Sequence, residues 1–175
     1  MLARPQPDEY GRIHDGYMRE VSEDNVLTAL EREGEDTMNM LGDLGEEGAG
    51  YRYRSGKWSI KEVLGHLTDS ERIFAYRALR IGRNDPTPLA SFEQDDYVAA
   101  ANFDRQELGD LLEQFRTVRR ESLLLFRSFD DQAWVRRGVA SGIETSTRAY
   151  PYLILGHERH HKRILRERYL PAMTR

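Results

Sequence analysis

The sequence predicts an all-α protein that folds as a four-helix bundle. Three observations carry this prediction: four long segments have apolar residues at spacings of three and four, no segment has a strong strand pattern, and loops of unequal length separate the four segments. The chain of 175 residues has no internal repeat and is long enough to bury a core of its own. We expect one domain over residues 1–175, with the core at about 21–170 and an N-terminal arm at 1–20.

The first two helices have recognisable ends. Apolar spacing predicts the first helix over residues 21–44, and the glycine-rich stretch 45–50 ends it. Ser59 is a good N-cap, and Glu62 follows it by three residues, which is the pattern of a capping box. The second helix is therefore expected to begin at Ser59 and to end near Ile81, before a loop that contains two prolines.

The second half of the chain carries the other two long helices. A short helix at about 94–101 is expected in the irregular segment before the third helix, which Asp104 would cap and whose inward face runs over 108–126. The stretch 135–145 contains glycine and serine and is either a small hairpin or a loop. The last helix begins within residues 146–151, with Pro151 near its start because proline is tolerated in a first turn, and it runs to about Tyr169.

Composition and charge limit the classes of function. The net charge of −4 argues against nucleic-acid binding through bulk charge, although the basic C-terminal stretch leaves a phosphate-binding surface open beside the simpler interpretation of solvated helix faces. No apolar run approaches the ~20 residues that span a bilayer, and the N-terminus has no apolar signal region. We therefore expect a cytoplasmic protein with no membrane partner. The absence of cysteine excludes disulfides, thiolate metal sites and a cysteine nucleophile.

The histidines give the strongest indication of function. His157 and His161 are four residues apart, which places them ~40° apart on a helix, within the apolar stripe of the last helix. Two buried imidazoles need partners, and this spacing suits a shared metal as well as hydrogen-bonded core histidines. His66 lies on the inward half of the second helix, so three histidines from two helices could form an open metal site. His14 belongs to the N-terminal arm and is expected to be exposed.

Two carboxylates lie close to these histidines in the sequence. Asp69 follows His66 by three residues and could orient a histidine ring, act as an extra ligand or be a plain surface carboxylate. Residues 157–161 (HERHH) match the HExxH pattern of zinc proteases, but no further ligand follows in a recognisable arrangement. Since Glu158 lies about 100° from His157 on the wheel, it is either a general base for other water chemistry or a solvent-facing residue.

Two segments together resemble the DinB-like superfamily. Residues 58–72 (WSIKEVLGHLTDSER) are similar to its first metal-binding helix and residues 156–161 (GHERHH) to its closing motif, most closely in the YfiT-like and bacillithiol-transferase-like branch. The resemblance spans roughly residues 21–170. It implies an up-down-down-up four-helix bundle, commonly a homodimer, and a divalent metal, zinc or nickel among them. The metal ligands that it implies are His66, His157 and His161.

The resemblance also implies a class of reaction. Relatives include thiol-dependent S-transferases and isomerases that use bacillithiol, mycothiol or glutathione, and others are described as metal-dependent hydrolases. We expect a metal site that activates a thiol cosubstrate or water for attack on a small electrophilic substrate, with Glu158 and Asp69 as candidate catalytic residues. Arg72, Arg77 and Arg80 on the second helix are candidate anchors for an anionic cosubstrate, and of these Arg77 lies on the side of His66; surface salt bridging is the alternative for all three. The alternative function is a non-catalytic metal-binding bundle in stress response.

Overall fold

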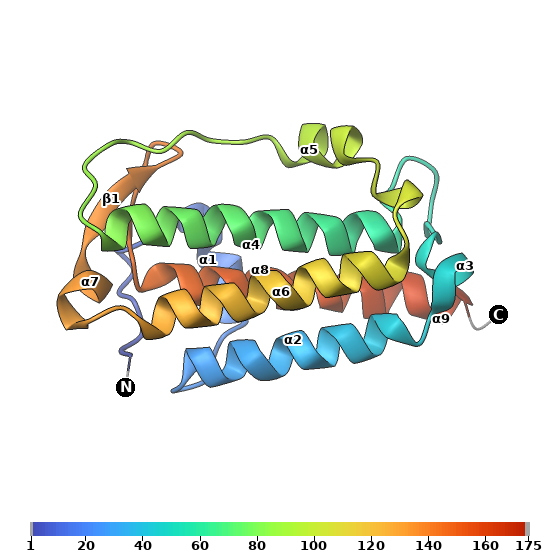
Figure 1. Ribbon diagram of the computed structural model, residues 1–175, viewed down its shortest axis with the longest axis horizontal. Helices are drawn as coiled ribbons and strands as arrows, with labels where there is room; N and C mark the ends of the chain where they lie inside the picture. Colours follow the sequence, from blue (N-terminus) through green and yellow to red (C-terminus); the bar gives the residue numbers. More distant parts are fainter. Residues whose placement is uncertain (1, 174–175) are drawn as a thin grey trace.

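The computed structural model describes residues 2–173 and confirms the four-helix bundle. In Figure 1, two of the long helices run in one direction and the two between them in sequence run in the other, which is the up-down-down-up order. The connection between the second and third long helices accordingly travels back along the whole bundle. The long helices are α2 Val26–Gly42, α4 Ile60–Gly82, α6 Leu108–Arg127 and α8 Ala149–Ile164. The outermost residues of the predicted domain, Met1, Thr174 and Arg175, lie outside the described residues.

Short elements surround the bundle, and the predicted hairpin is present. The strands β1 Arg137–Ala140 and β2 Ile143–Ser146 pair antiparallel, with Ala140 opposite Ile143. The expected short helix is α5, and a π-helical turn, η3, continues α8. The other short elements are η1 Arg12–His14, α1 Asp15–Arg19, α3 Gly45–Ala49, α5 Gln94–Ala101, η2 Phe103–Arg105, α7 Asp131–Val135, η3 Leu165–Tyr169 and α9 Leu170–Met173.

The start of α4 confirms the capping box, whereas the predicted cap of α6 is wrong. The backbone N–H of Glu62 donates to Ser59 Oγ at 3.0 Å, and the backbone N–H of Ser59 donates to Glu62 Oε2 at 2.8 Å. Asp104 lies in η2 rather than at the N-cap of α6, which is Glu107. Its carboxylate accepts from Ser59 Oγ at 2.5 Å and pairs with Arg52. Asp104 thereby fixes the crossover connection, the segment 83–107 between α4 and α6, to the start of α4.

A polar layer divides the core of the bundle. One apolar cluster lies toward the β-hairpin and the other toward α3; α2, α4 and α6 contribute buried residues to both, α8 to the first and its continuation η3 to the second. Between the clusters, buried polar side chains from the four long helices hydrogen-bond to one another: Thr37, Glu71, Arg119 and Glu158. Polar groups at this depth are costly unless they are hydrogen-bonded, so the layer has to be internally satisfied or functional.

The N-terminal segment is packed against the bundle. Helix α1 lies on α8 at Gly156, where an added Cβ would stand only 2.2 Å from the carbonyl oxygen of Tyr17. Glycine is required there because no side chain fits between the two backbones. This packing makes His14 partly buried, so the expectation that it is exposed is wrong. No helix in the described part of the chain has both the length and the apolar content needed to cross a bilayer.

Candidate metal centre

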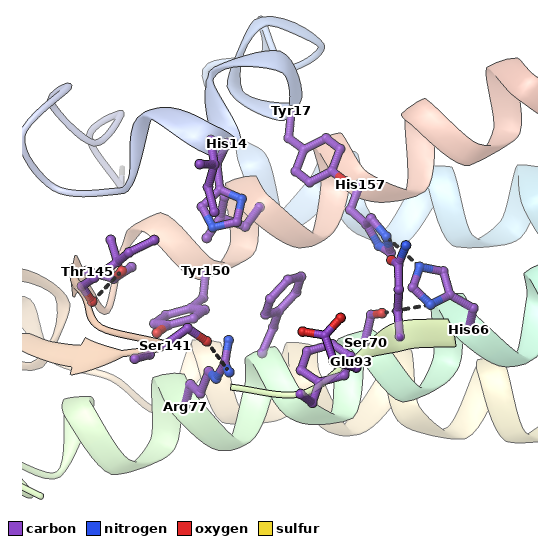
Figure 2. A pocket seen from close by; sticks show the side chains of 17 residues that line it. His14, Tyr17, His66, Ser70, Arg77, Glu93, Ser141, Thr145, Tyr150 and His157 are labelled. Atoms are coloured by element: carbon purple, nitrogen blue, oxygen red, sulfur yellow. Dashed lines mark hydrogen bonds between the residues drawn. The ribbon is translucent and has the colours of Figure 1, made fainter. Parts of the chain in front are cut away.

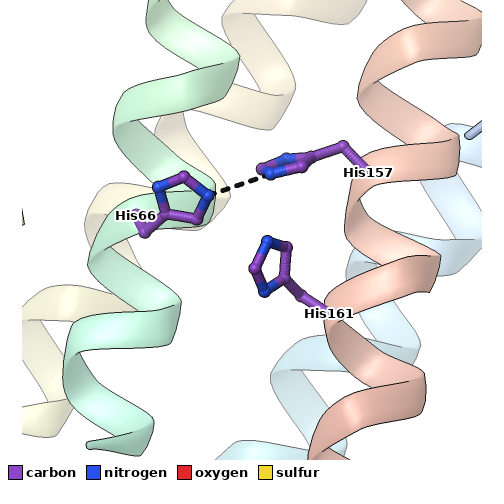
Figure 3. A group of neighbouring side chains, drawn as sticks. All are labelled: His66, His157 and His161. Atoms are coloured by element: carbon purple, nitrogen blue, oxygen red, sulfur yellow. Dashed lines mark hydrogen bonds between the residues drawn. The ribbon is translucent and has the colours of Figure 1, made fainter. Parts of the chain in front are cut away.

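Helices α4 and α8 bring the three predicted histidines together (Figure 3). His66 Nε2 lies 2.9 Å from His157 Nε2, and the ring centroid of His161 lies 4.9 Å from that of His66 and 4.6 Å from that of His157. One ring nitrogen from each of the three histidines lies within 4.8 Å of the other two. The i, i+4 spacing on α8 places two of the rings one turn apart, and the inward face of α4 supplies the third.

Burial keeps these imidazoles neutral. It lowers the pKa of His66 to about 4 and that of His161 to about 3, and it lowers the pKa of His157 well below its ordinary value. The mutual proximity of the rings lowers the pKa of His157 and His161 further. A neutral imidazole with a free lone pair is the form that binds metal ions, so the cluster is ready to act as a ligand set at neutral pH.

Aromatic rings enclose the cluster. The indole of Trp58 stacks on His161 at 6.4 Å and lies 4.8 Å from the ring of His66, while Tyr17 meets His157 edge-on at 5.4 Å. On the opposite edge of His66, Ser70 Oγ approaches Nδ1 at 3.5 Å, the outer limit of a hydrogen bond. A contact at Nδ1 leaves Nε2 directed at the other two histidines, as a metal site requires.

The residues present fit a bound divalent metal. Three neutral nitrogen donors from rigid helices are the ligand set of open zinc sites, in which a further position is left for water or substrate. Two nitrogens at tetrahedral positions around zinc stand roughly 3.3 Å apart, given Zn–N distances of about 2.0–2.1 Å. The observed 2.9 Å between Nε2 atoms is close to that value. Without a metal, the Nε2 atoms of His66 and His157 can satisfy each other only by sharing one proton.

Glu158 faces away from the cluster and is fully buried. Only 1% of it is exposed, so the expectation of a solvent-facing residue is wrong. Its Oε1 accepts from Thr37 Oγ1 at 2.6 Å, and its Oε2 accepts from Arg119 Nη2 at 2.8 Å. Arg119 also donates to both carboxylate oxygens of Glu71, at 2.8 to 3.2 Å. These contacts form the polar layer and occupy both oxygens of Glu158.

Asp69 and Arg77 lie at different places relative to the histidines. Asp69 is partly exposed, and its carboxylate accepts from Arg72 Nη1 at 2.8 Å, so it is not part of the histidine group. Arg77 is only 7% exposed and lines a cavity of about 320 Å³ that His66 and His157 also line. The structure therefore joins Arg77, but not Asp69, to the space beside the histidines.

Several residues of this cavity were not found from the sequence (Figure 2). His14 and Tyr17 come from the N-terminal segment, Glu93 from the crossover connection, Ser141 from the hairpin turn and Tyr150 from the start of α8. Except for Tyr150, which precedes His157 by seven residues on α8, they lie too far from the histidines in the sequence for a helical wheel to relate them. The one available signal was Tyr150, which directly precedes Pro151 at the start of the helix that carries two of the histidines.

Comparisons with known proteins agree with the fold. The sequence model of the DinB superfamily matches residues 29–165. The fold is similar to that of YfiT from Bacillus subtilis, described as a probable metal-dependent hydrolase with an unusual four-helix bundle topology, with a TM-score of 0.69 and 15% identity over 94% of this chain and 92% of that one.

A second solved structure has the same fold. It is a mycothiol-dependent maleylpyruvate isomerase, with a TM-score of 0.68 and 11% identity over 82% of this chain. The chain spans 60% of that protein's length. No curated protein matches the sequence. At 15% and 11% identity, these two structures show which fold the chain has.

Proposed function

Since this chain belongs to the DinB superfamily, we propose that it is a metal-dependent enzyme acting on a small electrophilic substrate. The observation that carries the proposal is the convergence of three neutral imidazoles from two helices, two of them buried and that of His161 half-buried, beside a cavity of about 320 Å³. The proposed ligands are His66, His157 and His161, and the metal is divalent, zinc or nickel in the first instance. When bound, such an ion supplies Lewis-acid chemistry that lowers the pKa of water or of a thiol.

The side chains around the cluster prepare the reaction space. Trp58 and Tyr17 cover the histidines from two sides, which restricts the approach of water. The cavity beside His66 and His157 remains open to a substrate. The nucleophile is water in a hydrolase or an external low-molecular-weight thiol in an S-transferase; the thiol has to be external because the chain has no cysteine. The relation to a mycothiol-dependent isomerase supports the thiol.

We propose that Glu158 acts through His157 rather than on the substrate. Its carboxylate is held by Thr37 and Arg119 on the far side of α8, so its effect is to fix the helical turn that carries His157. A catalytic role for Asp69 stays a prediction, and its ion pair with Arg72 gives that role no direct support. Arg77 is the proposed anchor of an anionic group, and the following subsection develops this role.

The alternative is a metal-binding bundle without catalysis. A structural site closes its coordination sphere with a fourth protein ligand, whereas a catalytic site keeps a position open. In the described residues the group contains three histidines and no carboxylate, which favours the open site. The proposed homodimer and cytoplasmic location remain predictions, which light scattering of the purified protein and cell fractionation test.

Metal content is the test of the proposal. Protein without an affinity tag is expected to carry about one divalent ion per chain by elemental mass spectrometry, and His66→Ala is expected to lose it, because two remaining imidazoles bind far more weakly. His160→Ala is the matched control: its ring is beside the cluster but contacts Arg163, outside the ligand group. Equal metal content in wild type and His66→Ala would overturn the proposed ligands.

A further inference from the structure

The cavity beside the histidines contains a buried cation without a counter-ion. Arg77 Nη2 donates to the carbonyl oxygen of Ala90 at 2.8 Å and to Ser141 Oγ at 2.9 Å. Its Cζ also lies 5.8 Å from the ring centroid of Phe92, but no ion pair of Arg77 and no hydrogen bond from its Nε or Nη1 occurs within the described residues. Burying an unpaired charge is costly, so a cation retained in this state needs a compensating role. Its two hydrogen bonds tie α4 to the hairpin but leave three N–H donors unused.

A second unsatisfied group lines the same cavity. Tyr150 is fully buried, and its Oη has no hydrogen-bond partner of ordinary geometry in the described part of the chain. Burial raises the pKa of Tyr150 to about 12, against the opposing influence of Arg77 and Thr145, so the hydroxyl is protonated and can donate. A buried donor without a partner is rare, and here it lies in the electrostatic field of an uncompensated guanidinium.

The hairpin turn completes this end of the cavity. Ser141 and Gly142 both have positive φ, 55° and 75°, as a two-residue type I′ turn requires. A left-handed conformation is unfavourable for serine, yet Ser141 adopts it, and its hydroxyl accepts the hydrogen bond from Arg77 Nη2. The turn therefore fixes the guanidinium so that Nε and Nη1 remain available.

The remaining walls define the complementary ligand. Figure 2 shows His66 and His157 at the end of the cavity opposite Tyr150 and Ser141. The side chains of Phe74, Phe92 and Leu153 line the space and are apolar. Arg77 is the one lysine or arginine among the described lining residues, and burial keeps His14 neutral by lowering its pKa. The exposed Glu93 also lines the cavity but makes no ion pair with Arg77 within the described residues. One buried positive charge matches a monoanion better than a dianion.

We propose that Arg77 and Tyr150, held by the Ser141 turn, bind the carboxylate of a small organic acid with an apolar body. The site itself rests on the geometry of the cavity. Its assignment to the substrate, with the reactive part extended toward His66 and His157, rests on the proposed metal-dependent function. A single guanidinium that still offers its Nη1 donors, with an adjacent phenol as a further donor, suits the two oxygens of a carboxylate.

The test is binding of benzoate and of benzamide to the full-length protein by isothermal titration calorimetry. The two probes share size and ring and differ in charge. Benzoate is expected to bind at least ~10-fold more tightly, because hydrogen bonds to a charged group contribute more than neutral ones. Arg77→Met should abolish that preference. Tyr150→Phe, which keeps the ring, should weaken the binding of benzoate by roughly 3- to 10-fold.

Matched controls keep the result interpretable. Arg80→Met changes an arginine one turn along α4 that pairs with Asp85 outside the cavity, and it should leave benzoate binding unchanged. If Arg77→Met fails to fold, Tyr150→Phe carries the test. Equal affinity for benzoate and benzamide in wild type would overturn the proposal, as would undiminished benzoate binding in a folded Arg77→Met. Tighter binding of inorganic phosphate than of benzoate would overturn the assignment to a carboxylate.

The titrations are made on metal-loaded and on chelator-treated protein, which separates the two proposals. Benzoate selectivity in protein that takes up no metal would uphold the anion site and contradict the metal-dependent function. Metal uptake without benzoate selectivity would contradict the anion site and leave the metal-dependent function standing. If both are correct, the preference for benzoate persists after chelation, because Arg77 and Tyr150 lie at the other end of the cavity from the histidines.

Discussion

Two arginines are buried almost equally deeply in this bundle but have opposite electrostatic surroundings. Arg119 is 4% exposed and Arg77 is 7% exposed. Arg119 contacts the carboxylates of Glu71 and Glu158 and the carbonyl oxygen of Leu30. Arg77 contacts a carbonyl, a hydroxyl and the ring of Phe92 and has no carboxylate partner within the described residues. Burial acts to lower the pKa of both, but the two carboxylates raise the pKa of Arg119 above its ordinary value, whereas that of Arg77 stays lowered.

The difference separates a structural charge from a functional one. The polar layer of Arg119 is closed, since each of its charged members finds a partner inside the protein. The cavity of Arg77 is open, since the guanidinium, the phenol of Tyr150 and the imidazoles of His66 and His157 retain unused hydrogen-bonding or ligand capacity. A protein keeps such unsatisfied groups where a ligand completes them, at a cost in stability.

Arg119→Met is expected to have the largest effect on stability. It would leave Glu71 and Glu158 buried together without a cation, which costs about 3–5 kcal/mol of the free energy of unfolding. Urea denaturation measures the loss. Arg116→Met on the same helix breaks only an exposed pair with Glu113 and should change stability by less than about 0.5 kcal/mol. A loss below about 1 kcal/mol for Arg119→Met would show that the layer is not a closed network.

Gly156→Ala tests how the open region is covered. The new Cβ would stand 2.2 Å from Tyr17 O, so α1 has to move, at a cost of about 1–3 kcal/mol. Since α1 and the preceding η1 supply Tyr17 and His14 to the cavity wall, the N-terminal segment should also become more susceptible to trypsin at Arg19. Gly16→Ala is the control: nothing lies within 4 Å of its added Cβ, and alanine favours a helix. Equal trypsin rates in Gly156→Ala and wild type would contradict this packing.

The sequence predicted local features of the fold and of the site well. The capping box at Ser59 and the first-turn proline at 151 depend on neighbouring residues, so they could be identified directly. The spacing of His157 and His161 placed both rings on one face, and the inward position of His66 brought it opposite them. These features need no knowledge of distant contacts.

The features that the sequence did not reveal depend on long-range contacts. Arg119 lies four residues from Phe115 and from Leu123, inside an apolar face, but a charged residue at such a position is ordinarily assigned to a surface. Its burial becomes plausible only when Glu71 and Glu158 are known to lie beside it. Asp104 failed as a cap for the same reason, because its partner Ser59 is 45 residues away.

Acid should break the ion pair between Glu9 and Arg148. Arg148 holds the pKa of Glu9 down to about 2, against an ordinary value of 4.5, and so ties the N-terminal segment to the start of α8. A depressed carboxylate pKa contributes stability that is present above the ordinary value and is lost as the pH falls toward about 2. We expect a contribution on the order of 1 kcal/mol after solvent screening.

Hydrogen exchange of the Ser146 amide, which donates to the carbonyl oxygen of Glu9 at 2.9 Å, reports this contact. Its protection should fall between about pH 4.5 and pH 2 in wild type. Glu9→Gln should show low protection at every pH and no transition in that window. A transition of the same size in Glu9→Gln would assign the acid response to other carboxylates.

Apart from the control variants, the smallest change in stability is expected for Arg77→Met, the counterpart of Arg119→Met. Loss of two hydrogen bonds costs about 0.5–1.5 kcal/mol each, while removal of an uncompensated buried charge returns a similar amount. The free energy of unfolding should therefore change by less than about 1 kcal/mol, in either direction. The same urea denaturation experiment measures it. A loss as large as that of Arg119→Met would mean that Arg77 is part of a closed network too, and the contrast between the two arginines would no longer identify a ligand site.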